Sequence, residues 1–375
     1  MKRILLDLFV ILTALCAGPI LVRMLRNRLQ REYLLALRAL IAAGSVLLLS
    51  GLVVLLLQAV ENELGFRWLL ASGVAFAWGV ALVAATGLCY ILLKIPTPVA
   101  PARRRLLTLA STAAITAPAA TLGYGMFIGR RQFHLKEVDL AIPNLAPDID
   151  GLRIAHLSDI HLSPFLSRAD LQWCVDMANE TRPQIAAVTG DLITGVRDSI
   201  DDCLTDLRRL RADAGIFGCT GNHELYIRAE AYTAERAARL GMKFLRHEQA
   251  SLRFGSTTIN IAGVDHKDNP WAFRPTAALL RPGEFNLLLN HNPTMFPSIV
   301  KQGWDVTLSG HMHGGQINLE LANANWNLAR FSTPYIYGTY RERNSTMFVT
   351  RGIGTIGMPV RLGAPPEVAL ITLRK

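Results

Sequence analysis

Cysteine is scarce in this sequence, with five among 375 residues, at positions 16, 89, 174, 203 and 219. Three of them fall within residues 134–375, and an odd number excludes the pairing of all three, although two of them could form one disulfide. None lies in the polar motifs described below, so a thiolate zinc site is excluded as well. Internal repeats and low-complexity linkers are also absent.

Excess charge is missing from residues 134–375, which carry 25 basic and 25 acidic residues. Residues 1–133 carry 14 Lys and Arg against four Asp and Glu, so the net charge of +10 belongs to the N-terminal region. A nucleic-acid-binding protein needs a basic face on its folded domain. The charge distribution therefore argues against a nucleic-acid partner.

Long apolar runs fill the N-terminal region, at residues 4–22, 34–60, 68–93 and 106–128. Because a membrane-spanning helix needs about 20 mostly apolar residues, we expect an all-α membrane region of four transmembrane helices over residues 1–133. Basic clusters at 23–31 and 94–105 place the first and third connections in the cytoplasm by the positive-inside rule. This predicts a multi-pass protein of the cell (inner) membrane, with residues 134–375 extracytoplasmic or periplasmic.

Residues 134–375 contain five polar motifs, each at the end of a strand-like run. They are Asp159-Ile160-His161, Gly190-Asp191, Gly221-Asn222-His223-Glu224, His291-Asn292-Pro293 and Gly310-His311-Met312-His313-Gly314-Gly315-Gln316. Helical patterns over 166–180, 198–212 and 229–240 separate several of these runs, which predicts an α/β layered domain. In such sheets ligands bind at the carboxyl ends of the strands, where these motifs lie.

The motifs offer imidazoles, carboxylates and a side-chain amide, a donor set that suits Mn²⁺, Fe or Zn²⁺. Asp191 is the candidate bridge, since a carboxylate has two oxygens and can contact two cations. Two ions about 3.5–4 Å apart can clamp the attacking and leaving oxygens at phosphorus and supply a hydroxide nucleophile near neutral pH. The pattern therefore indicates hydrolysis of a phosphate ester.

Over residues 150–320 the order of these motifs resembles the calcineurin-like metallophosphoesterases, and the segment that follows is similar to their membrane-associated bacterial branch. The resemblance implies a four-layer α/β/β/α sandwich. It implies one divalent ion held by Asp159, His161, Asp191 and His313, and a second held by Asp191, Asn222, His291 and His311. It also implies that His223 stabilises transition-state charge or protonates the leaving oxygen, with Asn222 assisting. Glu224 stands where many members have Asp, and we expect it to orient the histidine.

Several other polar residues allow two interpretations. Asp265-His266 follows a strand-like run over 257–264 and could approach the site, although a plain turn is the favoured interpretation. Arg351 or Arg361 could grip a substrate phosphate, whereas a structural ion pair of Arg361 with Glu367 is the alternative.

The combined prediction is a membrane-anchored, two-metal phosphohydrolase that cleaves a phosphodiester or pyrophosphate by attack of a metal-bridging hydroxide. The partners would be a phosphoester substrate and the lipid bilayer, and a lipid-linked substrate is one option because an anchor would hold the site near lipid. The resemblance also offers a UDP-2,3-diacylglucosamine pyrophosphatase of lipid A synthesis, and a protein phosphatase would use the same ions. A non-catalytic membrane sensor is disfavoured, since no ligand of the motif set is missing.

Overall fold

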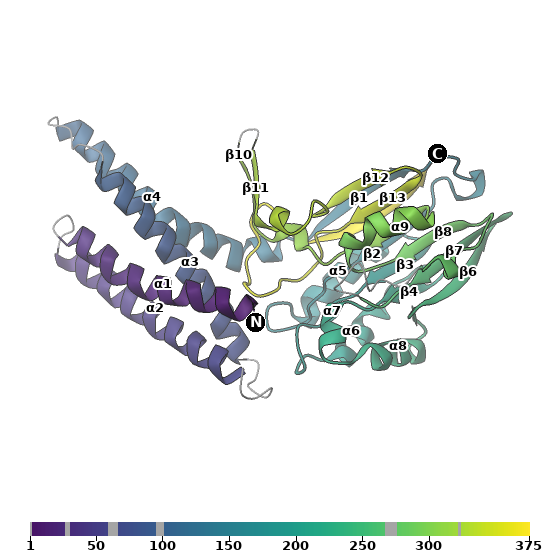
Figure 1. Ribbon diagram of the computed structural model, residues 1–375, viewed down its shortest axis with the longest axis horizontal. Helices are drawn as coiled ribbons and strands as arrows, with labels where there is room; N and C mark the ends of the chain where they lie inside the picture. The colour runs from purple at the N-terminus through teal and green to yellow at the C-terminus, as the bar shows by residue number, and fades with distance from the viewer. Residues whose placement is uncertain (1, 27–30, 59–66, 95–100, 267–275, 322–323) are drawn as a thin grey trace. The chain divides into compact units, whose positions relative to one another are not determined.

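A computed structural model describes residues 2–26, 31–58, 67–94, 101–266, 276–321 and 324–375 (Figure 1). The chain divides into two compact units, and each is described by itself. The first comprises Met1–Ile128 with Gly357–Val360, and the second comprises Gly129–Ile356 with Arg361–Lys375.

The first unit consists of long helices. Their bounds are α1 Lys2–Leu25, α2 Arg31–Gln58, α3 Arg67–Leu93 and α4 Pro101–Phe127. Helices α1, α2 and α3 share a small apolar core in which Leu21, Ile41 and Leu82 are buried together. Thr86 ties α3 to α1, because its hydroxyl donates to the carbonyls of Leu82 at 2.8 Å and Ala17 at 3.3 Å.

The described part of the four apolar runs lies within these helices, except for residue 128, which follows α4. Residues 59–60 of the second run are outside the described part of the chain. Spanning a bilayer takes about 20 consecutive, mostly apolar residues. Within the described residues, no helix meets the combined demands of length and apolar character for a membrane crossing. The predicted all-α region of four transmembrane helices is therefore wrong. The prediction of a multi-pass inner-membrane protein with a periplasmic catalytic domain is wrong for the same reason.

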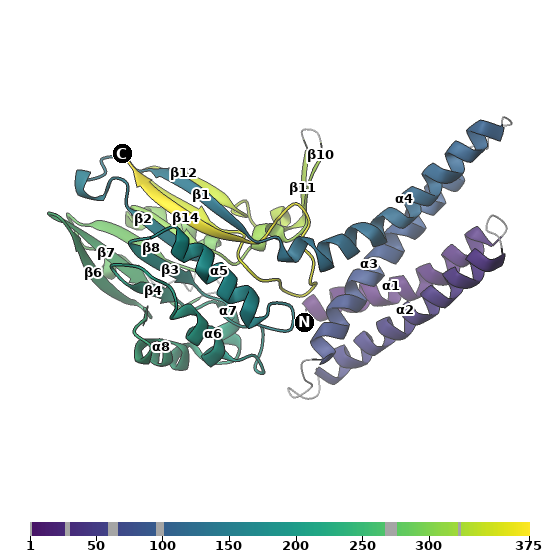
Figure 2. The ribbon, with the colours of Figure 1, turned by 180° about the vertical axis from the view of Figure 1, so that it is seen from behind.

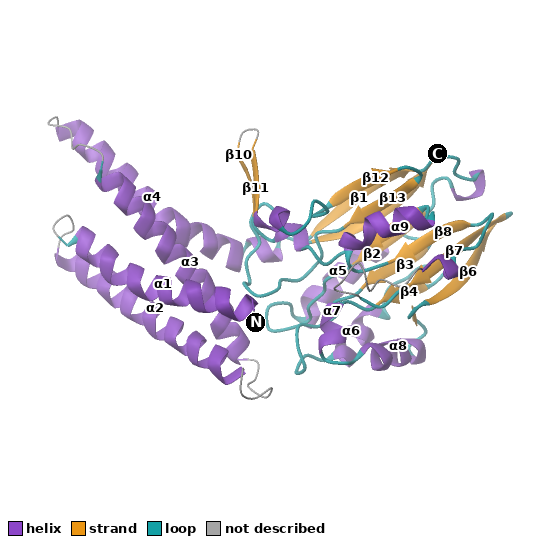
Figure 3. Cartoon of the chain, viewed as in Figure 1, coloured by secondary structure: helices purple, strands orange, loops and turns teal. Residues whose placement is uncertain are grey.

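Two six-stranded sheets form the second unit (Figure 3). In the first sheet the order is β1-β14-β2-β3-β4-β5, and β2 to β5 run parallel. Its strands are β1 His134–Ala141, β2 Arg153–Leu157, β3 Ile185–Thr189, β4 Ile216–Cys219, β5 Lys243–Phe244 and β14 Glu367–Arg374. Every residue of β3 is buried, as expected for a central parallel strand that is covered on both faces.

The second sheet has the order β12-β13-β9-β8-β7-β6, in which β7, β8, β9 and β13 run parallel. Its strands are β6 Glu248–Phe254, β7 Thr257–Gly263, β8 Phe285–Leu289, β9 Val306–Ser309, β12 Gly338–Glu342 and β13 Ser345–Val349. A separate hairpin pairs β10 Asn318–Leu321 with β11 Ala324–Asn327.

The main core of the second unit lies between the two sheets. Ile154 and Ile185 from the first sheet pack with Ile259, Leu287 and Phe348 from the second, and all five are buried. Burial of such a side chain contributes about 1.5–3 kcal/mol. This face-to-face contact holds the two sheets together, so that their strand ends form one shared edge.

Helices cover the outer faces of both sheets. The first sheet is covered by α5 Arg168–Glu180, α6 Ile200–Leu207 and α8 Glu230–Arg239, with α5 lying along the sheet beside β14 (Figure 2). Helix α9, Phe296–Gln302, packs on the second sheet through Ile299. The two-sheet α/β architecture implied by the motifs is thus present in this unit.

Local sequence signals fix the ends of these helices. Ser167 caps α5, since its hydroxyl accepts the Asp170 N–H while the Asp170 carboxylate accepts the Ser167 N–H. Such a reciprocal pair satisfies two helix-end donors. Gly303 ends α9 at φ +92°, a left-handed conformation that glycine adopts without a Cβ clash.

Candidate metal centre

The structure brings all the predicted site residues together at one edge of the two sheets. They follow β2, β3, β4, β8 and β9. The two site residues beyond β4, Asn222 and His223, begin a short helix, α7 Asn222–Tyr226. Contacts described below link Asp159, His161, Asp191, Asn222, His223, His291, His311 and His313 into one cluster. The strand-end arrangement inferred from the sequence is therefore the one observed.

Backbone strain is concentrated in these loops. Asp159, His161, Asp191, His311 and His313 all adopt positive φ, between 49° and 74°. Residues other than glycine rarely occupy this left-handed region, and each costs of the order of 1 kcal/mol or more. These left-handed turns bend the chain just beyond β2, β3 and β9, where the side chains converge.

Two motif glycines allow the loops to approach the carboxylates closely. A Cβ on Gly221 would lie 2.1 Å from Asp191 Oδ1, and one on Gly310 would lie 2.2 Å from Asp159 Oδ2. Either contact is far inside van der Waals range. Glycine is therefore required at both positions by the packing around the site.

Asp159, His161, Asp191 and His313 form the first donor cluster, and all four are buried. His161 Nε2 lies 3.1 Å from His313 Nε2 and 3.5 Å from Asp191 Oδ2. His313 Nε2 lies 3.4 Å from Asp159 Oδ1. Ligand atoms held about 2.1 Å from one ion at roughly tetrahedral to octahedral angles are about 3–3.5 Å apart, so this donor set fits a divalent metal.

The second donor cluster is centred on His291. Its Nε2 lies 3.2 Å from Asp191 Oδ2 and 3.2 Å from Asn222 Oδ1. The His311 ring is 5.0 Å from the His291 ring, centroid to centroid. Asp191 Oδ2 thus faces both His161 and His291, which is the position that a carboxylate bridging two ions would take.

Backbone hydrogen bonds orient the site side chains. The Nδ1 atom of His291 lies 2.6 Å from the Thr189 carbonyl, and that of His223 lies 2.6 Å from the Thr194 carbonyl. Since a carbonyl only accepts, both Nδ1 atoms donate, which leaves each Nε2 directed to other partners. Asp191 Oδ1 accepts the His223 N–H at 2.9 Å, which frees Oδ2 for the two clusters.

Glu224 has a different role from the expected one of orienting the histidine. Its buried carboxylate accepts three backbone N–H groups, from Asp191 at 3.0 Å, Leu192 at 2.8 Å and Gly221 at 2.7 Å. These groups belong to the loops after β3 and β4. Glu224 therefore joins the two loops that carry Asp191 and Asn222, while the Thr194 carbonyl orients His223.

The surroundings of Asp159 and Asp191 shift the pKa values of the two carboxyl groups in opposite directions. Burial raises the pKa of Asp159 to about 6. Burial opposes ionisation of Asp191 too, but the adjacent His291 and His161 hold its pKa well below the usual range. For His291 burial disfavours the charged ring, yet Asp191 and Asp159 outweigh it and raise the pKa to about 10.

Burial keeps three other histidine rings of the two clusters neutral. It lowers the pKa of both His161 and His311 to about 3, and it holds that of His313 well below the ordinary value. A neutral imidazole is the form that binds a metal ion. The site thus combines three neutral imidazoles with a protonated His291 and an ionised Asp191.

The ion pair of Arg361 with Glu367, one of the two interpretations of the C-terminal arginines, is not the arrangement observed. Arg361 is 1% exposed, and its guanidinium donates to backbone carbonyls, among them those of His313 at 3.0 Å and Arg351 at 2.8 Å. Its expected partner Glu367 instead lies near Arg351, with Nε and Oε2 3.9 Å apart. Arg351 also covers the ring of Tyr337, 4.4 Å from its centroid.

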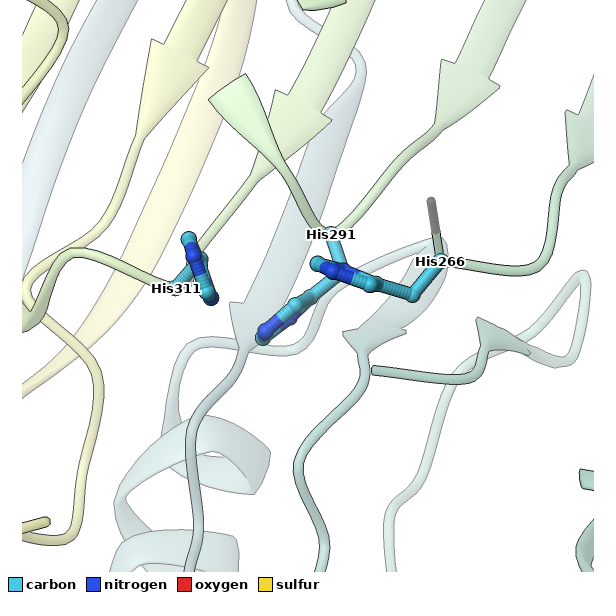
Figure 4. Close-up of side chains that lie close together, drawn as sticks. All are labelled: His266, His291 and His311. Atoms are coloured by element: carbon cyan, nitrogen blue, oxygen red, sulfur yellow. The ribbon is translucent and has the colours of Figure 1, made fainter. Parts of the chain in front are cut away.

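One histidine lies closer to the site than the sequence pattern indicates. The pattern favours a plain turn at His266, but this side chain is buried beside His291 and His311 (Figure 4). The sequence feature that could have indicated this position is that His266 follows a strand-like run, which forms another parallel strand of the second sheet and ends at the same edge as the motifs.

Two sheets, helices on their outer faces and two Asp/His clusters at the strand ends are the features of a metal-dependent phosphohydrolase. Residues 152–315 match the calcineurin-like phosphoesterase family. This match confirms, for residues 152–315, the resemblance of the motifs to the calcineurin-like metallophosphoesterases.

Curated relatives point the same way. The chain is 28% identical over 267 residues to a transmembrane protein with metallophosphoesterase domain from Danio rerio, covering 67% of this chain and 60% of that protein. It is 28% identical over 263 residues to the uncharacterized metallophosphoesterase YkuE of Bacillus subtilis (strain 168), covering 67% of this chain and 89% of that one. The solved structure of TT1561 from Thermus thermophilus aligns at a TM-score of 0.40 and 12% identity, over 54% of this chain and 90% of that chain.

Proposed function

We propose that residues 134–375 hydrolyse a phosphodiester or pyrophosphate bond with the help of two divalent metal ions. The observation that carries this proposal is the position of Asp191 Oδ2, which lies 3.5 Å from His161 Nε2 and 3.2 Å from His291 Nε2. One carboxylate oxygen is thus shared by two donor clusters. When bound, two such ions activate water and neutralise the charge that develops on the phosphoryl group.

The first ion would be held by Asp159, His161, Asp191 and His313, and the second by Asp191, Asn222, His291 and His311. Carboxylate, imidazole and amide donors suit Mn²⁺, Fe or Zn²⁺. Asn222 also has a role at the substrate, because an amide N–H can donate to a phosphoryl oxygen as its charge grows.

His223 is the residue placed to handle a proton. Its Nδ1–H is held by the Thr194 carbonyl, and its ring meets that of His161 edge-on at 4.7 Å. The side chain is 8% exposed, so it lies at the rim of the buried cluster. From there the protonated ring would donate to the leaving oxygen, which is a typical general-acid role.

A cavity of about 390 Å³ opens beside His311 and His313 and would receive the leaving group. Its lining mixes hydroxyl, amide and apolar side chains, including Thr294, Met312, Gln316, Thr333 and Ile356. This volume is at the small end of ligand sites, which favours a compact leaving group. The lipid-linked substrate depended on a membrane anchor and is not part of this proposal.

The test is turnover of bis-p-nitrophenyl phosphate and of a dinucleotide pyrophosphate by the full-length protein with added Mn²⁺ or Zn²⁺. We expect His223→Gln to lower kcat by about 10²–10⁴-fold while both ions stay bound. Asp191→Ala should abolish turnover and reduce bound metal, whereas His134→Gln, an exposed histidine of β1, should match the unmodified protein. Equal rates in all four proteins would place the chemistry elsewhere.

A further inference from the structure

His266 lies outside the five motifs, yet its ring joins the second cluster. It is 1% exposed, and its ring centroid lies 5.5 Å from that of His291 and 5.3 Å from that of His311. The three rings turn toward one another from the ends of β7, β8 and β9 (Figure 4), and their candidate ligand nitrogens all lie within 4.8 Å of one another. We propose that His266 is a further ligand of the second metal ion.

Strand register places His266 level with His291. Gly263, the last residue of β7, pairs with Leu289, the last residue of β8. The next residue, Val264, still donates its N–H to the Leu289 carbonyl at 3.3 Å. His266 and His291 therefore leave adjacent parallel strands at nearly the same height, and both reach the shared edge.

The neighbouring acid is fixed in another direction. Asp265 Oδ1 accepts from Thr220 Oγ1 at 3.0 Å and from Arg246 Nε at 3.1 Å, and Asp265 Oδ2 accepts from Arg246 Nη2 at 2.9 Å. Neighbouring side chains in an extended segment point to opposite sides. Anchoring Asp265 against Thr220 and Arg246 thus directs His266 toward His291 and His311.

Two buried imidazoles, His266 and His291, and the half-buried His311 pack together, and a proton on one ring disfavours a proton on the next. A divalent cation can accept the lone pairs of several neutral rings at once. Nitrogens that share one ion at about 2.1 Å lie roughly 3–3.5 Å apart. Since the candidate nitrogens of the three rings already lie within 4.8 Å of one another, a shift of under about 1 Å in each ring would bring them onto one ion. The existing ring arrangement is close to that of a ligand set.

The inference rests on the proposed two-ion centre and adds an asymmetry to it. With His266 the second ion has three imidazoles besides the oxygens of Asn222 and Asp191. The first ion has two imidazoles and two carboxylates. Imidazole suits Zn²⁺, Co²⁺ and Fe better than Mn²⁺ or Mg²⁺, so the second position should be the more selective for these metals.

The experiment measures metal binding to the purified full-length protein. Metal-free samples of wild type, His266→Ala, His266→Gln and the control His134→Ala would be titrated with Co²⁺, followed by visible absorption and by the ion content after dialysis. We expect both His266 variants to bind the first ion normally and the second about 100-fold more weakly, consistent with losses of 10–100-fold for metal-supporting residues. Added imidazole should restore the second ion to His266→Ala but leave His266→Gln unchanged.

Each outcome distinguishes this inference from the proposed function. If wild type binds two ions and both His266 variants bind them with unchanged affinity, the ligand role of His266 is overturned and the two-ion centre stands. If wild type binds fewer than two ions, the two-ion centre fails, and the inference fails with it. If the variants do not fold, X-ray absorption on the zinc-loaded wild type decides, because a mean of 2.5 imidazoles per ion is expected with His266 and 2 without it.

Discussion

Glu224 offers the sharpest test of how the centre is held together. Its carboxylate accepts the N–H groups of Asp191, Leu192 and Gly221, and it has no exposed surface. A buried N–H that loses its acceptor costs about 1–3 kcal/mol. Glu224→Ala should therefore lower the free energy of unfolding by at least about 3 kcal/mol. Glu224→Gln can keep two of the three bonds through its carbonyl oxygen, and we expect a loss of about 2 kcal/mol.

The assay is thermal unfolding of the full-length protein with saturating Zn²⁺ and with chelator, together with metal content. At about 2–4 °C per kcal/mol, Glu224→Gln should melt about 4–8 °C lower, and Glu224→Ala should melt lower still and retain less metal. Glu235→Gln is the control, because Glu235 is 64% exposed on α8 and pairs only with the nearby Arg239 in the described residues. Melting of Glu224→Gln within 1 °C of wild type, with full metal content, would refute the loop-joining role.

Three further predictions concern buried basic groups. Burial lowers the pKa of His156 to about 3 from about 6.5 in the unfolded chain, so the unfolded state binds more protons below pH 6.5. Between pH 6.5 and pH 3 the unfolding free energy of wild type should fall by about 1.4 kcal/mol per pH unit more than that of His156→Gln. Urea unfolding midpoints of both proteins at pH 7 and pH 5 measure this, and an equal change with pH in the two proteins would contradict it. Arg361→Met should leave several carbonyls unpaired and lower the unfolding free energy by about 2–4 kcal/mol, and Arg361→Lys should recover part of this loss. Equal urea midpoints in wild type and both variants would contradict the prediction. The pKa of His291 is raised to about 10, so binding of the second ion at pH 7 should release about one proton, which calorimetry in buffers of different ionisation enthalpy would detect or exclude.

The clustering of the proposed metal ligands could be predicted because each lies within a few residues of a strand end. Parallel strands bring their carboxyl ends to one edge, so Asp159, Asp191 and His291 had to be neighbours once the strands were recognised. The chemistry of a carboxylate also indicated Asp191 as the proposed bridge, and its Oδ2 lies between His161 and His291. The predicted helix over 198–212 was too long, since α6 ends at Leu207.

Other features depend on tertiary contacts that local patterns do not encode. His266 reaches the site through the pairing of β7 with β8, and Arg361 folds back onto the loop of His313 from 48 residues away. For the N-terminal helices the local pattern led to a wrong prediction of membrane spans. Apolar residues such as Leu21, Ile41 and Leu82 pack against one another, and a run of them reads the same in a helix bundle as in a membrane span.

The central claim is that two ions share Asp191. Anomalous diffraction from zinc-loaded crystals of the full-length protein tests it most directly. The account predicts two peaks about 3.5–4 Å apart on either side of Asp191, one beside His161 and His313 and the other beside His291 and His311. A single peak, or two peaks that do not flank Asp191, would contradict it.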